Sequence, residues 1–458
     1  MTGYESFLNA KRQFGSPSGF EPVWMPDFLY DFQAALCEWS IGKGRASINA
    51  DCGLGKTPMQ EVWAQNVIEY TNKPVLILTP LAVSAQTIRE AVKFGIEAEQ
   101  SRDGRFTGKK IVVTNYERLH YFNPDDFAGV VCDESSAIKA FDGKRRKQVT
   151  RFLSGIPYRL LCTATAAPND YIELGTASEA LGELSQSEML ATFFVSSDKM
   201  RHSLFREGDF WNRPKWFFRP HAQTPFWRWV CSWARALRSP ADMGFDGSRF
   251  KLPELIVNQH VIDKVFIHPG ELFPRIAKTL AEQRVERKRT IVERCERVAE
   301  LVDHDEPAVM WCQYNAEGDL LEKMIPGAVQ VAGRHSDEDK EERLTAFSLG
   351  QIKKLVTKSK IAAWGLNWQH CGHQTFFPSH SYEQWYQAIH RSLRFGRKDP
   401  VRVDVVATVG EEGVTANLQK KQGKADAMFT ALVREMNHHN NIVQENRHVN
   451  RMEVPAWL

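Results

Sequence analysis

The sequence predicts an α/β protein with two parallel sheets, each covered by helices on both faces. Two blocks of the chain, Ser47 to Thr163 and Ala308 to Thr408, alternate short apolar runs with helical patterns. Apolar runs of this kind are typical of parallel strands, which are buried on both faces. Length supports the same prediction, because 458 residues are too many for one ordinary core and fit two domains.

Each block predicts a set of strands. The first block predicts strands at 46–50, 75–79, 111–114, 129–132 and 159–163. The second predicts strands near 308–313, 328–331, 353–357, 374–377 and 402–407. Helices are predicted where apolar residues recur at helical spacing, at 59–70, within 272–302 and around 425–436. The predicted division of the chain is a first α/β domain at 1–195, an insert and linker at 196–255, a second α/β domain at 256–412 and a helical tail at 413–458.

The composition is that of a globular protein, with 43% hydrophobic and 25% charged residues. The formal net charge is only +3, so a nucleic-acid surface would have to come from local clusters of Lys and Arg. The eight cysteines are scattered without the close pairs of a zinc site or a secreted disulfide framework, which predicts reduced thiols in a cytoplasm. No apolar run is long enough for a signal core or a membrane span, so we expect neither export nor a membrane partner.

The segment Ala50–Thr57 follows a predicted strand, precedes a predicted helix and has the A/G-x-x-x-x-G-K-T spacing of a phosphate-binding loop. Gly53 and Gly55 would let the backbone curl so that N–H groups face a β-phosphate. Lys56 would reach the β- and γ-phosphates, and the Thr57 hydroxyl would ligate Mg²⁺. The alternative is a Gly-containing turn with an incidental Lys-Thr pair. The flanking strand and helix favour the nucleotide site.

A second motif, Val130–Ser136, is an apolar run that contains two adjacent acids at its end. At the carboxyl end of a strand Asp133 can bind the metal, often through water, while Glu134 polarises the attacking water. An Asp-Glu pair alone is weak evidence, because exposed acids commonly begin loops. After a hydrophobic strand and downstream of a phosphate loop, it predicts ATP hydrolysis.

Between the two blocks the chain mixes aromatic and basic residues. The aromatic residues include Trp211, Trp216, Phe217, Phe218, Phe226, Trp227, Trp229 and Trp233. The interleaved basic residues are Arg206, Arg213, Lys215, Arg219 and Arg228. Such a mixture can stack bases and hold phosphates, and it can equally form a small aromatic core with solvated arginines. In the first interpretation the nucleic-acid contacts are Arg213, Lys215 and Arg219.

The order of these motifs resembles that of superfamily-two helicase motors. The chain is most similar to the Swi/Snf-like DNA-dependent ATPases, and in particular to compact phage-encoded helicases of the DEAD/DEAH type, over nearly its whole length. Phe28–Gln33 resembles the adenine-reading segment of this family, which implies that Gln33 hydrogen-bonds the edge of the base. Leu78–Leu81 and Thr114–Glu117 resemble motifs that track a strand. The nucleic-acid contacts that this implies are Thr79 and Tyr116.

Cys162–Ala166 resembles the segment, usually written T-G-T-P-x-x-N, that couples hydrolysis to DNA binding, which implies coupling roles for Thr163 and Thr165. The chain departs from the family pattern twice. Ala164 stands where Gly is usual, and the acid pair is followed by two serines where the family has Ala-His. The small residues should fit, but Ser136 replaces a His that often helps communicate between the motor halves.

The second block carries motifs of the family's distal domain. Trp311–Tyr314 and Val331–Gly333 resemble DNA-facing motifs. Thr357–Lys360 and Gly365–Trp368 resemble a motif that reaches both DNA and nucleotide, usually ending G-L-N-L. The contacts that this implies are Gln313, Ser359 and Asn367 for nucleic acid and Gly365 for the nucleotide.

The most specific match is Gln387–Arg397, which is close to the family pattern Q-A-x-x-R-x-x-R-x-G-Q. Arg391 and Arg394 lie three residues apart, so on a helix they would share one face and point across the cleft between the domains. They are the candidate arginine fingers, and Gln387 is a candidate coupling residue. The alternative for either arginine is a solvated charge on a helix.

The resemblance implies two RecA-like domains, with ATP at the carboxyl ends of the first domain's strands and arginines supplied by the second. Closure around ATP and Mg²⁺ would shift one domain along double-stranded, forked or branched DNA, in the cytoplasm of a bacterium or a phage-infected cell. The expected function is an ATP-dependent DNA helicase or translocase. The alternatives are a duplex translocase that does not separate strands, an RNA-directed motor, and a nucleotide-gated subunit of a larger phage or restriction complex with phage or host protein partners.

Overall fold

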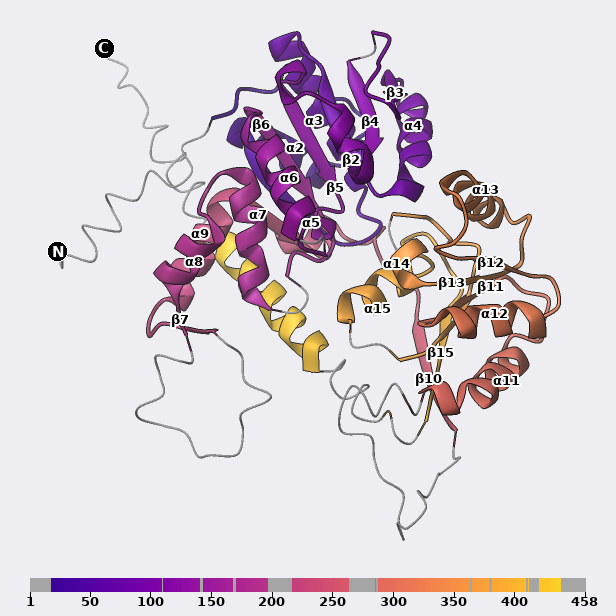
Figure 1. Ribbon diagram of the computed structural model, residues 1–458. Coiled ribbons are helices and arrows are strands. Elements are labelled where there is room, and N and C mark those ends of the chain that lie inside the picture. Colours follow the sequence, from indigo (N-terminus) through magenta and orange to yellow (C-terminus); the bar gives the residue numbers. More distant parts are fainter. Residues whose placement is uncertain are drawn as a thin grey trace, which may run out of the picture.

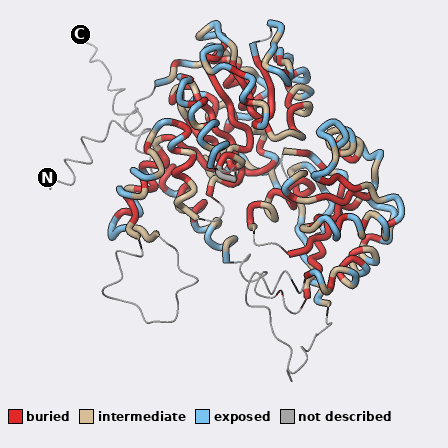
Figure 2. The backbone as a smooth tube through the Cα atoms, in the orientation of Figure 1, coloured by how far each residue is buried: buried red, intermediate tan, exposed pale blue. Residues whose placement is uncertain are grey.

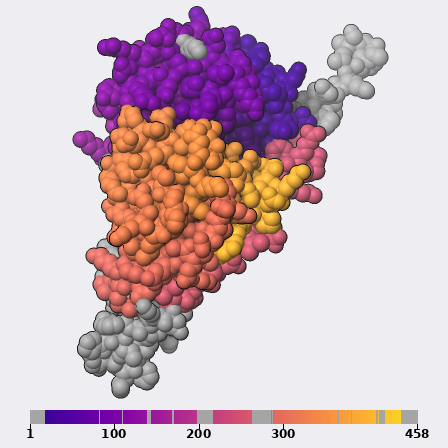
Figure 3. Space-filling view, turned by 90° about the vertical axis from the view of Figure 1, so that its right-hand side faces the viewer, coloured from indigo at the N-terminus to yellow at the C-terminus, as the bar shows by residue number. Residues whose placement is uncertain are grey.

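The structure, a computed structural model, contains two α/β units that lie against each other (Figures 1 and 3). It describes residues 18–108, 110–140, 143–167, 170–196, 216–262, 285, 287–362, 365–378, 381–408, 411 and 420–437. Within these ranges, no helix is long and apolar enough to cross a membrane. The predicted fold class, two parallel sheets flanked by helices, is confirmed.

The first unit is built on a seven-stranded parallel sheet with the order β3-β4-β2-β5-β6-β1-β9. Its strands are β1 (Arg45–Ala50), β2 (Val75–Thr79), β3 (Ala98–Gln100), β4 (Ile111–Asn115), β5 (Gly129–Asp133), β6 (Tyr158–Cys162) and β9 (Ala234–Leu237). All the strands predicted for the first block are present. The sequence pattern does not indicate the edge strands, because β3 has only three residues and β9 directly continues an aromatic-rich helix.

Helices cover both faces of this sheet. One face carries α2 (Asp31–Lys43), α3 (Lys56–Thr71) and α4 (Ser84–Lys93). The other carries α5 (Ser136–Ala140), α6 (Gly143–Ser154), α7 (Leu174–Leu181), α8 (Gln186–Phe193) and α9 (Gln223–Trp233). Along β2 the side chains alternate between the two cores, with Val75 and Ile77 on one face and Leu76 and Leu78 on the other. Figure 2 shows the buried residues gathered in the interior of each unit.

The segment 196–255, predicted as an insert and linker, contributes to the first unit. Its strand β9 pairs in parallel with β1. A short antiparallel pair, β7 (Phe194–Ser196) and β8 (Trp216–Phe218), packs against the same core. The aromatic residues that α9 buries there are Phe226, Trp227, Trp229 and Trp233. These four form a core, as one of the two interpretations expects. Trp211 lies outside the described residues.

The helix at 420–437 packs on the first unit although it follows the second unit in the chain (Figure 1, yellow). The side chains that it buries beside α9 are Met428, Phe429, Leu432 and Met436. The Cys231 Sγ atom of α9 lies 3.7 Å from the carbonyl oxygen of Leu432. The chain therefore leaves the first unit after β9, builds the second unit and returns.

The second unit has a six-stranded parallel sheet with the order β10-β15-β14-β11-β13-β12. Its strands are β10 (Leu255–Ile262), β11 (Ala308–Trp311), β12 (Ala328–Val331), β13 (Lys354–Thr357), β14 (His373–Phe376) and β15 (Val401–Thr408). Its helices are α11 (Ile291–Leu301), α12 (Asn315–Met324), α13 (Asp337–Ser348), α14 (Ser359–Ala362) and α15 (Tyr382–Ile389). All the strands predicted for the second block are present, and the edge strand β10 is additional. Of the predicted helical stripe at 272–302, α11 forms the end, and 263–284 lies outside the described residues.

Candidate functional site

Residues from both units line one cleft between them. The first unit contributes the loop between β1 and α3, the turn after β5 and residues near α4, and the second contributes the segments before β14 and after α15. The sequence-predicted residues in this lining are Gly53, Gly55, Lys56, Thr57, Asp133, Glu134, Gly365, Asn367, Arg391 and Arg394. The space measures about 810 Å³, open solvent at its mouth included.

The predicted phosphate loop curls at its glycines. Gly53 and Gly55 have φ values of +87° and +75°, which L side chains rarely adopt. A Cβ atom at position 53 would come within 2.8 Å of the Phe395 ring of the second unit, and one at position 55 would meet the side chain of Gln33. Helix α3 begins directly after this loop, so its first turn, with N–H groups free for a ligand, borders the cleft.

Lys56 and Gln33 hold the loop from within. Lys56 Nζ donates to the carbonyl oxygens of Ala50 and Asp51 at 2.8 and 3.1 Å. Gln33, on α2, is buried, and its Nε2 donates to the carbonyl oxygen of Leu54 at 2.9 Å. A bound phosphate would therefore compete with two carbonyl oxygens for the Lys56 ammonium group.

The two predicted acids lie at the end of β5, and both are buried. Asp133 Oδ1 accepts a hydrogen bond from Gln60 Nε2 at 2.7 Å. Burial, and then the adjacent Glu134, raise the pKa of Asp133 to about 6. A cation in the cleft would favour the charged form of this carboxyl.

Glu134 has a left-handed backbone, with a φ of 49°. That region is unusual for a residue with a side chain, and such strain clusters at functional sites. Its Oε2 atom lies 3.4 Å from Thr163 Oγ1 and 3.4 Å from Gln387 Nε2 of the second unit. The carboxylate therefore lies at the boundary between the two units.

Oxygen donors that suit a divalent cation gather at the same place. Thr57 and Asp133 both line the cleft, and in the described part of the chain neither Asp133 nor Glu134 forms an ion pair. Two buried carboxyls that form no ion pair there fit Mg²⁺, which prefers oxygen ligands. Across the described ranges, no group of three His, Cys, Asp or Glu side chains could hold a metal ion by itself. The donor set therefore fits an ion that also takes ligands from a bound phosphate.

The structure corrects one expectation about the arginines. Helix α15 ends at Ile389, so Arg391 and Arg394 lie in the turns that follow it and do not share a helical face. Their Nε atoms donate to the carbonyl oxygens of Gln387 and His390, at 2.8 and 3.1 Å. These side-chain bonds give partners to carbonyl groups at and just after the end of the helix.

The two guanidinium groups nevertheless converge. Arg391 Nη1 and Arg394 Nη2 donate to the same carbonyl oxygen, that of Leu366, at 3.0 and 2.8 Å. Burial, and then the neighbouring Arg391, lower the pKa of Arg394 to about 10, which leaves it charged at neutral pH. Together with Lys56 the two arginines put three cations around one cleft, which suits a polyphosphate.

The predicted coupling residues connect the two units. Thr165 Oγ1 lies 3.4 Å from Glu383 Oε1 and 3.3 Å from Gln387 Nε2. Gln387 Oε1 accepts a hydrogen bond from Arg391 Nη2 at 2.8 Å. Because Gln387 also reaches Glu134, one side-chain amide bridges an acid of the first unit and an arginine of the second.

Two of the predicted nucleic-acid residues lie inside the first unit. Thr79, at the end of β2, is fully buried, and its hydroxyl lies 2.8 Å from Ser84 Oγ. Tyr116 is also buried, and its hydroxyl donates to the carbonyl oxygen of Asp133 at 2.8 Å. In this structure both side chains support the site from within and do not face solvent.

The other nucleic-acid predictions fall in varied surroundings. Asn367 is exposed at the cleft, Gln313 is half-buried after β11, and Ser359 is buried at the start of α14. Arg219 is exposed, but its guanidinium donates to backbone carbonyl oxygens of α8 and β7 at 2.9 and 3.1 Å. Outside the described residues lie Arg213 and Lys215.

Several residues at or beside the site are not singled out by the sequence motifs. Gln60 holds Asp133, and its place one helical turn after Lys56 is the signal that could have found it. Asp51 and Tyr386 meet between the two units, where the tyrosine hydroxyl donates to the aspartate Oδ1. No local pattern indicates this pair, because 335 residues separate its members.

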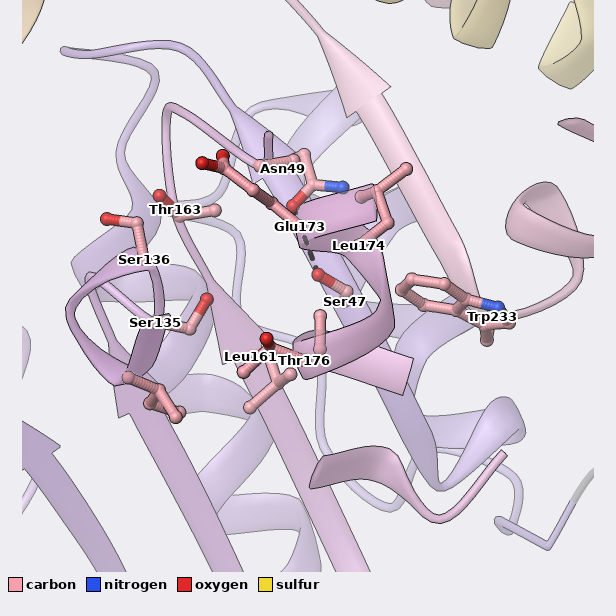
Figure 4. A pocket seen from close by; sticks show the side chains of 13 residues that line it. Ser47, Asn49, Ser135, Ser136, Leu161, Thr163, Glu173, Leu174, Thr176 and Trp233 are labelled. Carbon is pink, nitrogen blue, oxygen red and sulfur yellow. Dashed lines mark hydrogen bonds between the residues drawn. The ribbon is translucent and has the colours of Figure 1, made fainter. Parts of the chain in front are cut away.

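A second cavity lies behind the acids, inside the first unit (Figure 4). Its polar lining includes Ser47, Asn49, Ser135, Ser136 and Thr163. Ser47 Oγ donates to Asn49 Oδ1 at 3.0 Å. Asn49 Nδ2 and Ser136 Oγ are buried and have no hydrogen-bond partner among the described residues. Water commonly satisfies buried atoms of this kind.

Comparison with solved structures identifies the architecture. The structure of S. cerevisiae Dbp5 bound to RNA and ADP BeF3 matches with a TM-score of 0.55 and 12% sequence identity, over 90% of this chain and 98% of that chain. The two units are therefore a tandem pair of RecA-like domains. The Sulfolobus solfataricus SWI2/SNF2 ATPase core in complex with dsDNA matches with a TM-score of 0.41 and 16% identity, over 90% of this chain and 96% of that chain. No protein-family model matches the chain, and no curated protein sequence does.

Proposed function

We propose that this chain is a nucleic-acid-dependent ATPase motor that moves along or remodels DNA. The observation that carries the proposal is the meeting, in one cleft, of Lys56 and Glu134 from the first unit with Arg391 and Arg394 from the second. Because both units contribute to the site, binding and hydrolysis of ATP would be linked to their relative position.

Binding of ATP would begin at the phosphate loop. The N–H groups at the start of α3 and the Lys56 ammonium group would hold the β- and γ-phosphates, once Lys56 leaves the carbonyl oxygens of Ala50 and Asp51. Gln33 would hydrogen-bond the edge of the base. Mg²⁺ held by Thr57 and Asp133 would neutralise charge on the phosphate oxygens.

In hydrolysis, Glu134 would orient a water molecule and accept its proton as the water oxygen attacks the γ-phosphorus. The bond from the γ-phosphorus to the bridging oxygen breaks, which yields ADP and phosphate. Arg391 and Arg394 would stabilise the charge on the transferring phosphoryl group when they exchange the Leu366 carbonyl oxygen for phosphate oxygens.

DNA is the partner that the order of the sequence motifs supports, because that order resembles the Swi/Snf-like DNA-dependent ATPases and their compact phage-encoded relatives. We assign α9, β9 and the helix at 420–437 to the first motor domain, since they pack in its core. RNA is the second candidate partner, because the matching Dbp5 structure is described as bound to RNA.

ATP turnover, measured with double-stranded, single-stranded and forked DNA and with RNA, tests this proposal. We expect slow turnover by the protein alone, stimulation by DNA, and no turnover in Lys56→Ala. Turnover that no nucleic acid stimulates would contradict the motor, and a complete lack of turnover would contradict the ATPase. Stimulation by RNA alone would favour the second candidate.

A further inference from the structure

A buried carboxylate and a tyrosine join the two units beside the residues of the proposed reaction. Asp51 belongs to the phosphate loop and is buried, whereas Tyr386 lies on α15. The Tyr386 hydroxyl donates to Asp51 Oδ1, and the same oxygen accepts the backbone N–H of Cys52 at 2.6 Å. Asp51 forms no ion pair with any described residue. The two hydrogen bonds to this oxygen thus come from different units, one from the phosphate loop and one from α15.

Tyr386 is held in a position to donate. Its ring stacks on His390, with centroids 4.0 Å apart and planes at 27°, and His390 Nδ1 donates to the Tyr386 carbonyl oxygen at 2.8 Å. Burial, and then Asp51, raise the pKa of the Tyr386 phenol, so it stays protonated. Burial also lowers the pKa of His390, so its ring stays neutral at neutral pH.

The chain neighbours of this pair are residues of the cleft. Cys52 follows the aspartate, and its Sγ atom lies 3.6 Å from Arg391 Nη2. Gln387 follows the tyrosine, and its Nε2 atom lies 3.4 Å from Glu134 Oε2. The hydrogen bond between Asp51 and Tyr386 thus joins two segments that both carry site residues.

We propose that Asp51 and Tyr386 form a tether that stabilises the closed position of the two units. The tether goes beyond the proposed ATPase, because it sets the balance between closed and open positions and not the chemistry of hydrolysis. It positions Gln387 and Arg391 at the cleft. The competing explanation is that other contacts set the closure and that the pair meets as a consequence.

The test measures closure without nucleotide. Cysteines introduced at two exposed positions, Lys73 and Gln351, carry a donor and an acceptor dye, while the eight native cysteines are buried. Single-molecule energy transfer then gives the ratio of closed to open molecules. Tyr386→Phe keeps the ring and its stack on His390 but removes the donor. Tyr382→Phe, one turn earlier on the same helix, is the matched control.

We expect Tyr386→Phe to lower the closed-to-open ratio about tenfold, as the loss of a hydrogen bond to a charged group should, and Tyr382→Phe to leave it unchanged. Asp51→Ala should lower the ratio to a similar extent, and the double variant no further, because both changes remove the same bond.

A wild-type ratio in Tyr386→Phe would overturn the tether, and so would additive effects of the two changes. Thermal unfolding shows whether each variant is folded. If Asp51→Ala is not folded, the result for Tyr386→Phe alone decides the test. Because no nucleotide is present, the outcome is independent of whether the protein hydrolyses ATP.

Discussion

Glu134 combines a left-handed backbone with a buried carboxylate, and both features lower stability. A non-glycine residue in this region costs about 1–3 kcal/mol, so the surrounding contacts must hold it there. The Ser135 N–H donates to the Cys162 carbonyl oxygen at 2.9 Å, and the Ala137 N–H donates to the Glu134 carbonyl oxygen at 2.8 Å. A side chain fixed in this way beside Asp133 has the pre-organisation that a catalytic base needs.

Glu134→Gln should leave ATP bound but unhydrolysed, because the amide keeps the shape of the side chain and cannot accept the proton of water. We expect turnover to fall by about 10²- to 10⁴-fold with little change in ATP affinity. Single-turnover hydrolysis and the binding of a fluorescent ATP analogue measure the two quantities. Glu117→Gln, at an exposed position outside the cleft, is the control. Hydrolysis at the wild-type rate would remove Glu134 from the mechanism.

Arg394→Ala should slow hydrolysis by about 10³-fold or more with little loss of ATP affinity, because an arginine finger acts mainly on the charge of the transition state. Arg391→Ala should also slow it, but Arg391 is buried and holds Gln387, so that change disturbs packing as well. Lys398→Ala removes an exposed cation four residues later and is the matched control. If both arginine variants kept DNA-stimulated turnover, the cleft would not be the active site.

Glu61, on α3, gives the stability of the protein a pH dependence. It is buried, and neither carboxyl oxygen has a hydrogen-bond partner in the described part of the chain. Burial, and then Glu90, raise its pKa from 4.5 to about 9. The folded state therefore holds this proton more tightly than the unfolded state. The contribution of this proton to the free energy of unfolding is fully present below pH 4.5, and it is lost as the pH rises toward 9.

Glu61→Gln should remove this loss. Between about pH 5 and pH 8 the variant should gain stability relative to the wild type by up to about 1.4 kcal/mol per pH unit. Chemical unfolding at several pH values measures the difference. Glu69→Gln, exposed near the end of the same helix, should follow the wild-type curve. If the free energies of unfolding of Glu61→Gln and the wild type changed with pH in parallel, Glu61 would not be the source of the pH dependence.

At the scale of elements, the central strands could be predicted because their apolar runs carry the signal locally. Strands β2 and β5 are uninterrupted runs of this kind. The edge strand β9 forms by pairing with β1, and its Ala-Arg-Ala-Leu sequence alone does not predict a strand. Helix α15 ends at Ile389, so the spacing of Arg391 and Arg394 does not predict the turns in which they lie. Motif residues of the cleft could be predicted, whereas their partners at long separation in the chain could not.

The aromatic helix α9 should act as a structural element. Trp233→Ala removes a fully buried side chain and should lower the free energy of unfolding by about 3–5 kcal/mol. Arg228→Ala, on the same helix, removes a side chain that is 64% exposed and should change stability by less than about 0.5 kcal/mol. Chemical denaturation measures both. Unchanged stability with weakened DNA binding in Trp233→Ala would instead make α9 a nucleic-acid surface.

At the scale of the whole molecule, the contacts that join the units differ in strength. At the rim, Arg102 Nη2 lies 3.1 Å from Glu341 Oε2, but exposed ion pairs of this kind contribute only about 0–1 kcal/mol. In the cleft, Gln387 is buried and reaches residues of both units. Buried polar contacts of this kind depend on the relative position of the units more than the rim pair does, so they are where hydrolysis and movement would be linked.

Gln387→Ala should therefore separate nucleotide binding from movement. The variant loses the amide that connects Glu134 with Arg391, so we expect nucleic-acid-stimulated turnover to fall by about tenfold or more, while ATP affinity stays within about twofold. Energy transfer between dyes on the two units should show less closure with a non-hydrolysable ATP analogue.

Gln384→Ala is the matched control for this last prediction. It removes the same side chain from the same helix, but the contact that it breaks is with Ser359 inside the second unit. It should keep both stimulation and closure. If Gln387→Ala were stimulated and closed like the wild type, communication between the units would run through the remaining side-chain contacts between them, such as Thr165 with Glu383 and Asp51 with Tyr386.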